Sequence, residues 1–189
     1  MNKKHLEILK AVRKLIAIQK AHWMVTKQLF VNSSHLIEKA EMAGLLMRRS
    51  MIRTAVLTFT SLVSDEHEGG EGRKNCNFDQ LKRCLGDKSA RQRIGDRILK
   101  ASQDFCLLID IRNEEIAHND LRNSLAEEFS IFDASLMDDA IVECCGIFDQ
   151  ICDELGLPSE KVSSCDYVLM TGDGETLLKA FASPSETNP

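Results

Sequence analysis

The fold is decided at the end of one long amphipathic pattern, Ile109-Asp110-Ile111-Arg112-Asn113-Glu114-Glu115-Ile116-Ala117-His118-Asn119-Asp120. Ile98 and Phe105 precede Arg112 at seven-residue steps. This spacing predicts one helix over about 88–118, with Arg112 on the stripe that faces inward. Burying a cation without a partner costs on the order of several kcal/mol, so Arg112 needs either a function or a carboxylate. The carboxylates close in sequence are Asp110, Glu114 and Glu115.

Arg112 and His118 form the closest arginine–histidine pair in this stretch. They are six positions apart, so on an ideal helix they point about 120° away from each other. They can converge only if the helix ends or loosens near Ala117. Asn119 and Asp120 follow directly and are typical helix-ending residues.

The rest of the chain repeats the same helical pattern. Leu9, Ile16, Trp23 and Phe30 recur at intervals of seven and predict a helix over about 3–31. Similar stripes predict long helices over about 35–64 and from about 135 to 155, where Gly156 and Pro158 end the last one. In that last helix, Asp138 follows Ser135 with the spacing of a capping acid. Short helices are expected over 78–85 and over 175–182. Asp87 or Ser89 is expected to cap the third long helix.

These elements predict an all-α fold, an up-and-down bundle of four main helices with a short C-terminal helix. We expect a single domain over residues 1–182 and a disordered tail over 183–189. The polar segment 65–77 is expected to be a surface loop, and Val168-Leu169-Met170 a short extended packing segment.

Charge and hydropathy narrow the function classes. The net charge is -5, so the chain is not a general nucleic-acid binder, and any RNA site must be a local positive patch. The sequence has no apolar run of about 18 residues and no secretory leader pattern. We therefore expect a cytoplasmic protein without a membrane partner.

The cysteines indicate free thiols and no metal. There are 7 cysteines and no C-x-x-C pair, so a structural zinc site is not expected. Cys144 and Cys152 fall on apolar positions of a helix, where free cysteine is usually a small buried side chain. We predict no cofactor.

A second candidate site lies in the middle of the predicted helix 35–64. Arg48, Arg49 and Arg53 fall within six positions and form a candidate patch for contacting RNA phosphates. The alternative is that they pair with Glu38, Glu41 or a neighbouring helix.

The pattern Arg112-Asn113 followed by His118 at the end of a long helix resembles the signature of the HEPN superfamily. The helix end over 57–65, the polar loop and the segment Asn77-Phe78-Asp79-Gln80-Leu81 resemble its AbiU-type, abortive-infection-like branch. The resemblance covers 50–155 loosely. It implies a helical bundle, a metal-independent ribonuclease used as a toxin or in phage defence, and a homodimer that joins two motifs at one cleft. By resemblance, the catalytic residues are Arg112, Asn113 and His118.

These residue types suit metal-free RNA cleavage, in which the 2′-hydroxyl attacks the adjacent phosphate. Histidine can move the proton near neutral pH, and the planar arginine fork can stabilise charge on the phosphoryl oxygens. Asn113 can orient a phosphate oxygen or the imidazole. One histidine per chain falls short of the two proton-transfer groups that the reaction uses, and a homodimer would supply the second.

Two alternatives stay open. The full arginine–asparagine–histidine set favours an RNA-cleaving enzyme, whereas the acidic net charge favours a non-catalytic HEPN-type module that binds RNA or a nucleotide. An antitoxin is a candidate partner. However, Asp120 stands where members paired with nucleotidyltransferase antitoxins carry a tyrosine, so that particular partner is not predicted.

Overall fold

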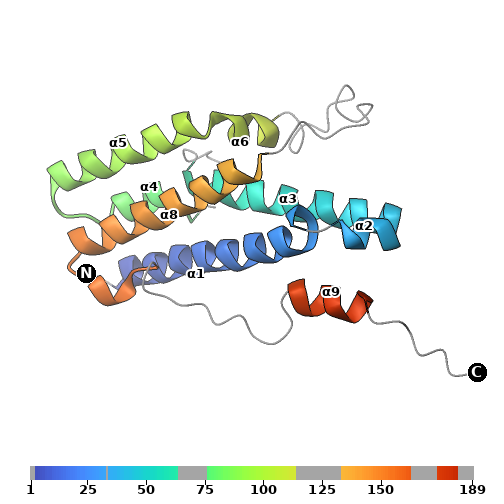
Figure 1. Ribbon diagram of the computed structural model, residues 1–189. Helices are drawn as coiled ribbons and strands as arrows, with labels where there is room; N and C mark the ends of the chain where they lie inside the picture. The colour runs from blue at the N-terminus through green and yellow to red at the C-terminus, as the bar shows by residue number, and fades with distance from the viewer. Residues whose placement is uncertain (1–2, 33, 64–75, 114–132, 163–173, 183–189) are drawn as a thin grey trace, which may run out of the picture.

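The computed structural model describes residues 3–32, 34–63, 76–113, 133–162 and 174–182. Every regular element in these ranges is helical, as predicted (Figure 1). The four main elements are α1 (Lys3–Thr26), α3 (Glu41–Val63), α5 (Lys88–Asp104) and α8 (Ala134–Glu154). They alternate in direction and form the predicted up-and-down bundle. The shorter elements are η1 (Lys27–Val31), α2 (His35–Lys39), α4 (Phe78–Lys82), α6 (Cys106–Ile111), η3 (Pro158–Glu160) and α9 (Gly174–Ala182).

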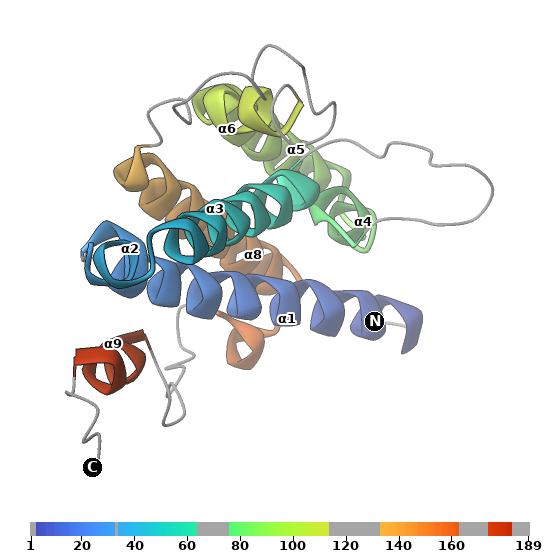
Figure 2. The same cartoon turned by 90° about the vertical axis from the view of Figure 1, so that its right-hand side faces the viewer.

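The core lies where the inward stripes of the main helices meet. Leu9, Ile16 and Trp23 of α1 are buried together with Ile147 and Ile151 of α8. The seven-residue row of the first helix is therefore confirmed. Figure 2 shows α3 between α1 and the α5–α6 segment, so α3 is covered on two sides.

The predicted helix over 35–64 is wrong in one respect, because it is broken after its first turn. Ala40 has φ −145° and ψ 59°, which separates α2 from α3. Leu36 of α2 is buried in a small second cluster with Leu29 and Phe30. A Cβ on Gly44 of α3 would lie 2.9 Å from the Ile37 Cα, so the glycine permits α2 to fold closely onto α3.

The predicted helix over 88–118 is also interrupted. Asp87 caps α5 by accepting a hydrogen bond from the Ala90 N–H at 2.7 Å, which confirms one of the two expected caps. The helix breaks at Phe105, with φ −111° and ψ 28°, and restarts as α6. Ile94, Ala101 and Leu108 remain fully buried across this break. Residues beyond 113, where the helix was expected to end, lie outside the described ranges.

The start of α8 corrects another expectation. Asp133, not Asp138, caps the helix, by accepting a hydrogen bond from the Ser135 N–H at 2.8 Å. The predicted end is confirmed. Gly156 has φ 68°, and Leu157 N–H donates to Cys152 O at 2.8 Å, the hydrogen bond of a Schellman motif.

The last short helix, α9, is confirmed and packs against η1 and α1. The Gly174 N–H donates to the Gln28 side chain at 3.0 Å. None of the described helices is long and apolar enough to cross a membrane. Residues 65–75 of the predicted surface loop, the predicted extended segment and the predicted disordered tail lie outside the described residues.

Candidate functional site

Two of the three motif residues lie at the end of α6. Arg112 and Asn113 are half-buried and belong to a π-helical turn that follows Ile111. The Arg112 Nη1 donates a hydrogen bond to the Asn113 Oδ1 at 2.9 Å. The amide therefore orients the guanidinium, which differs from the two expected roles of Asn113, to orient a phosphate oxygen or the imidazole. His118 lies outside the described residues, so its distance from Arg112 stays a prediction.

Arg112 makes no ion pair with a carboxylate of the described residues. Of the three carboxylates close to Arg112 in sequence, the structure describes only Asp110, which is exposed and does not bind the guanidinium. Glu114 and Glu115 lie outside the described ranges. Since no carboxylate of the described residues binds it, the Arg112 guanidinium keeps N–H donors that a phosphate could use.

Other cations of the bundle are engaged in structural ion pairs. Arg97 of α5 binds both carboxylate oxygens of Glu143 on α8, at 2.7 and 2.9 Å, and its pKa is raised by these hydrogen bonds. Arg13 binds Glu160 at 2.9 Å, and Arg93 binds Glu154 at 2.7 Å. Arg112 differs from them in having an amide as its described partner.

The segment that leads to Arg112 packs against α3, the helix that carries the second candidate site. The ring of Phe105 packs edge-on against the ring of Phe59 on α3, with centroids 5.5 Å apart. α6 and α3 run in opposite directions (Figure 1). α6, which ends next to Arg112, thus packs against the second half of α3.

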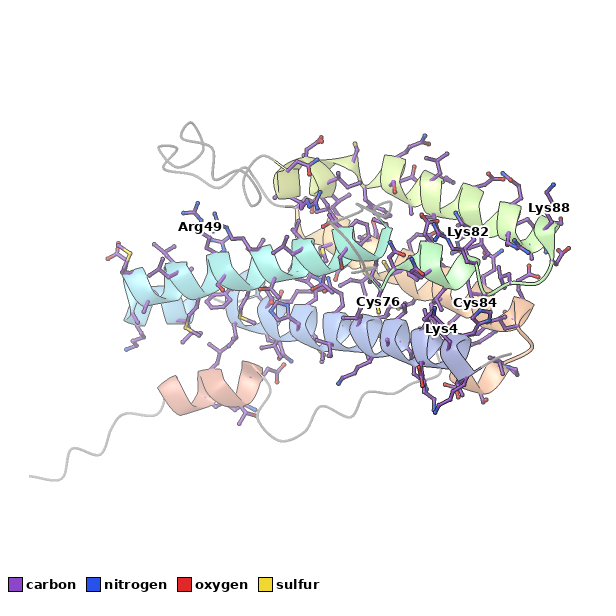
Figure 3. The ribbon with its side chains drawn as sticks, turned by 180° about the vertical axis from the view of Figure 1, so that it is seen from behind. Lys4, Arg49, Cys76, Lys82, Cys84 and Lys88 are labelled. Carbon is purple, nitrogen blue, oxygen red and sulfur yellow. The ribbon has the colours of Figure 1, made fainter. Side chains whose placement is uncertain are left out.

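The three arginines of α3 do not share one face. Arg49 and Arg53 are one turn apart and lie on the same face. Figure 3 shows that Arg49 projects from α3 on the side on which α6 lies. Arg48 is rotated by about 100° from Arg49 and lies off the face that Arg49 and Arg53 share.

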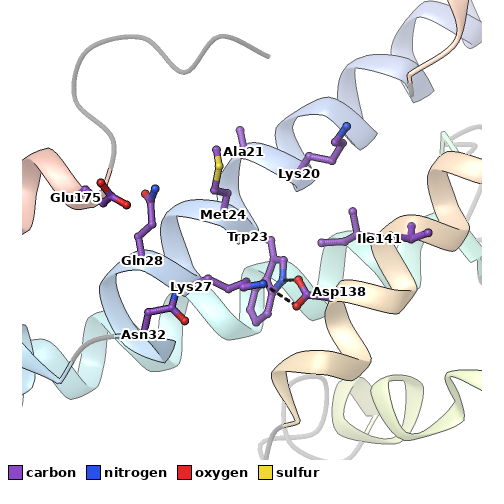
Figure 4. Close-up of a pocket in the computed structure, with 11 residues that line it drawn as sticks. Lys20, Ala21, Trp23, Met24, Lys27, Gln28, Asn32, Asp138, Ile141 and Glu175 are labelled. Carbon is purple, nitrogen blue, oxygen red and sulfur yellow. Dashed lines mark hydrogen bonds and ion pairs between the residues drawn. The ribbon is translucent and has the colours of Figure 1, made fainter. Parts of the chain in front are cut away.

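Sequence reasoning missed a groove where α1, α8 and α9 meet (Figure 4). Its volume is about 760 Å³. At its centre the Asp138 carboxylate accepts hydrogen bonds from the Trp23 indole N–H at 2.8 Å and from the Lys27 ammonium at 2.7 Å. Glu175 of α9 also lines it. No signal in the sequence links Asp138 to Trp23, since they are 115 positions apart.

The cysteine predictions fit the described residues. The six described cysteines are free, and Cys144 and Cys152 are buried as expected. Burial raises the pKa of the Cys152 thiol to about 12. The described residues contain no group of three or more histidine, cysteine and acidic side chains that could hold a metal ion.

No protein-family model, curated protein or solved structure matches this chain.

Proposed function

We propose that this protein is a metal-independent endoribonuclease of the HEPN type that serves as a toxin or in phage defence. The observation that carries the proposal is the state of Arg112. Its guanidinium ends a helix, is oriented by the Asn113 amide at 2.9 Å, and is bound to no carboxylate of the described residues. Arg49 and Arg53 share one face of α3, and Arg49 projects on the side of α6, so they would extend the positive surface along an RNA backbone.

In this mechanism the arginine and the histidine divide the work. Arg112 offers its planar fork to the non-bridging oxygens of the phosphate, where charge builds up as the 2′-oxygen attacks. His118 takes the proton from the 2′-hydroxyl or gives one to the leaving 5′-oxygen. Asn113 holds the guanidinium in the orientation that the fork needs. The second proton-transfer group would come from His118 of a second copy in a homodimer.

The second candidate is a module of the same type that binds RNA or a nucleotide without cutting it. The net charge of -5 favours it, because a weakly attracting surface suits a small ligand better than a long RNA. Both candidates use Arg112, and they differ in whether His118 moves a proton.

The test is RNA cleavage by the purified full chain in EDTA, with end-group analysis of the products. We expect products that end in a 2′,3′-cyclic phosphate. His118→Ala should reduce the rate by about 10²–10⁴-fold, the usual contribution of a general acid or base. Arg112→Lys should also fail, because an ammonium keeps the charge but lacks the bidentate fork.

The matched control is Arg91→Lys, because Arg91 is an exposed arginine at the other end of the α5–α6 segment that donates to the Gly86 carbonyl. It should cleave like wild type. If wild-type protein binds RNA but cuts none, or if His118→Ala cuts as fast as wild type, the enzyme proposal is wrong and the binding module replaces it.

A further inference from the structure

The chain between α8 and α9 is attached to the bundle at two points. Val162 is fully buried, and its N–H donates to the Asp149 carboxylate of α8 at 2.7 Å. Gly174, which begins α9, donates its N–H to the Gln28 side chain of α1 at 3.0 Å. Residues 163–173, which join these two points, lie outside the described residues.

On α1, both attachment points share the face that lines the groove where α1, α8 and α9 meet. Glu160 of η3 binds Arg13 at 2.9 Å. At about 100° per residue, Arg13 and Gln28 lie within about 60° of each other around the helix. Lys20 and Met24 lie between them along this face, and both line the groove (Figure 4).

The same relation holds on α8. Asp138, Val142 and Asp149 fall within an arc of about 40° at the same angle per residue. Asp138 and Val142 line the groove, and Asp149 continues their face toward the point where Val162 is held. The direct path from Val162 to Gly174 therefore follows the groove.

The length of 163–173 fits this path. Arg13 and Gln28 are 15 residues apart, which is about 22 Å along a helix. The 12 residue steps from Val162 to Gly174 can span up to about 40 Å. The segment is thus long enough to follow the groove, and its spare length allows a turn.

The apolar residues of the segment match the lining of the groove. Met24, Ile141 and Val142 form an apolar wall, and Val142 is 70% exposed. The segment carries one apolar run, Tyr167-Val168-Leu169-Met170, near its middle. Contact between this run and the wall would remove both apolar surfaces from water, which is favourable.

The charges are complementary as well. Lys27 is bound to Asp138, whereas Lys20 makes no ion pair with a described residue. The segment contains two aspartates and no lysine or arginine. Because the chain enters the groove at the end nearest η3, Asp166 precedes the apolar run as Lys20 precedes Met24.

We propose that residues 163–173 dock in this groove, with the run at 167–170 covering Met24 and Val142 and with Asp166 paired to Lys20. A segment held at both ends has an effective concentration on the order of millimolar, so a contact too weak for a free peptide still forms. The groove is thus an intramolecular docking surface, filled by this chain and not by a separate ligand.

Chymotrypsin tests the docking, because it cleaves extended chain after tyrosine and large apolar residues. Cleavage within 167–170 of the full chain, identified by mass spectrometry, follows the population in which the segment is undocked. Wild type should be cut slowly there. Val142→Glu should speed this cleavage by roughly tenfold or more, because it places a charge in the apolar contact. If wild type and Val142→Glu are cut at the same rate, the proposal is wrong.

The matched control is Leu99→Glu, because Leu99 is 59% exposed on α5 and does not line the groove. It should be cut at the wild-type rate, and circular dichroism should show that both variants are folded. Faster cleavage of this control would trace the effect to general destabilisation and overturn the proposal. So would protection that is lost on dilution, because it would mean that a second copy covers the groove.

A charge exchange tests the order of the segment in the groove. Lys20→Glu should speed the cleavage about two- to fivefold, the size expected from an ion pair near the surface. Lys20→Glu with Asp166→Lys should return the rate toward that of wild type, whereas Lys20→Glu with Asp173→Lys should not. If the variant with Asp166→Lys is cut as fast as Lys20→Glu alone, the proposed pairing is wrong.

Discussion

Gly146→Ala should destabilise the bundle, although alanine is the better helix former. Gly146 lies inside α8, where it faces Arg97 of α5. A Cβ at this position would lie 2.4 Å from the Arg97 Nη2 and 3.3 Å from its Cζ. An arginine on a free surface would swing away at little cost. Here the guanidinium is fixed by Glu143 at 2.7 and 2.9 Å and by the Gly146 carbonyl and Gln150 at 3.0 and 2.9 Å.

The magnitude follows from those hydrogen bonds. Moving the guanidinium gives up its two bonds to Glu143, and a hydrogen bond to a charged group contributes about 1.5–3 kcal/mol. The two side chains are 32% and 30% exposed, so solvent screening reduces the loss to roughly 2–3 kcal/mol in total. Alanine recovers about 1 kcal/mol of helix propensity. The net destabilisation should be about 1–2 kcal/mol.

The assay is urea unfolding of four proteins that make a double-mutant cycle, namely wild type, Gly146→Ala, Arg97→Ala and the double variant. Without the arginine, the clash is gone and Gly146→Ala should stabilise by about 0.5–1 kcal/mol. The change of sign is the signature of the contact. Gly95→Ala on α5 is the control, because its Cβ would meet Lys82 at an ordinary 3.5 Å, and it should stabilise in either background. A stabilising effect of Gly146→Ala in the wild-type background would refute the reasoning.

Three further predictions concern single side chains. Asp138→Ala should cost about 1–3 kcal/mol in urea unfolding followed by tryptophan fluorescence, since it leaves the buried indole N–H of Trp23 without its acceptor; an unchanged midpoint would argue against this contact. At pH 8 a thiol reagent should modify the exposed thiol of Cys76 but not that of Cys152, which is buried and which its pKa of about 12 keeps protonated. Mass spectrometry of the native protein after the reaction will tell the two cysteines apart. The Ala90 N–H lowers the pKa of Asp87, so its capping contribution is present at neutral pH and is lost as the pH falls through that lowered pKa. Asp87→Asn should therefore flatten the acid side of the stability profile, and an unaltered profile would contradict it.

The helices could be predicted because their apolar spacing is local. Leu9, Ile16 and Trp23 lie on one stripe whatever the rest of the chain does, and all three are buried. The break at Ala40 could not be predicted in the same way. The apolar pattern continues through it, and the break accompanies the burial of Leu36 in a cluster with Leu29 and Phe30, which forms only once α2 folds back.

Polar contacts between helices were the least predictable feature. Asp138 follows Ser135 at the spacing of a capping box, yet its carboxylate binds Trp23 and Lys27 of α1. Asp133, which does cap α8, has no special neighbour in sequence to distinguish it. Which carboxylate caps a helix depends on which residue has the non-helical φ and ψ angles of an N-cap. Sequence spacing determines those angles only loosely.

The position of Arg112 shows how one local break changes a site. An unbroken helix would carry Ile98, Phe105 and Arg112 inward together, and the arginine would need a buried carboxylate. The break at Phe105 turns the following residues, so that Ile111 occupies the core position while Arg112 moves to the half-buried edge. The edge is a better place for a phosphate-binding arginine, because the guanidinium stays accessible while the Asn113 amide still fixes its orientation. The phenylalanine pair that accompanies the break, Phe59 with Phe105, also joins this segment to α3. The same aromatic contact thus supports the core and holds α6, which ends next to Arg112, against α3.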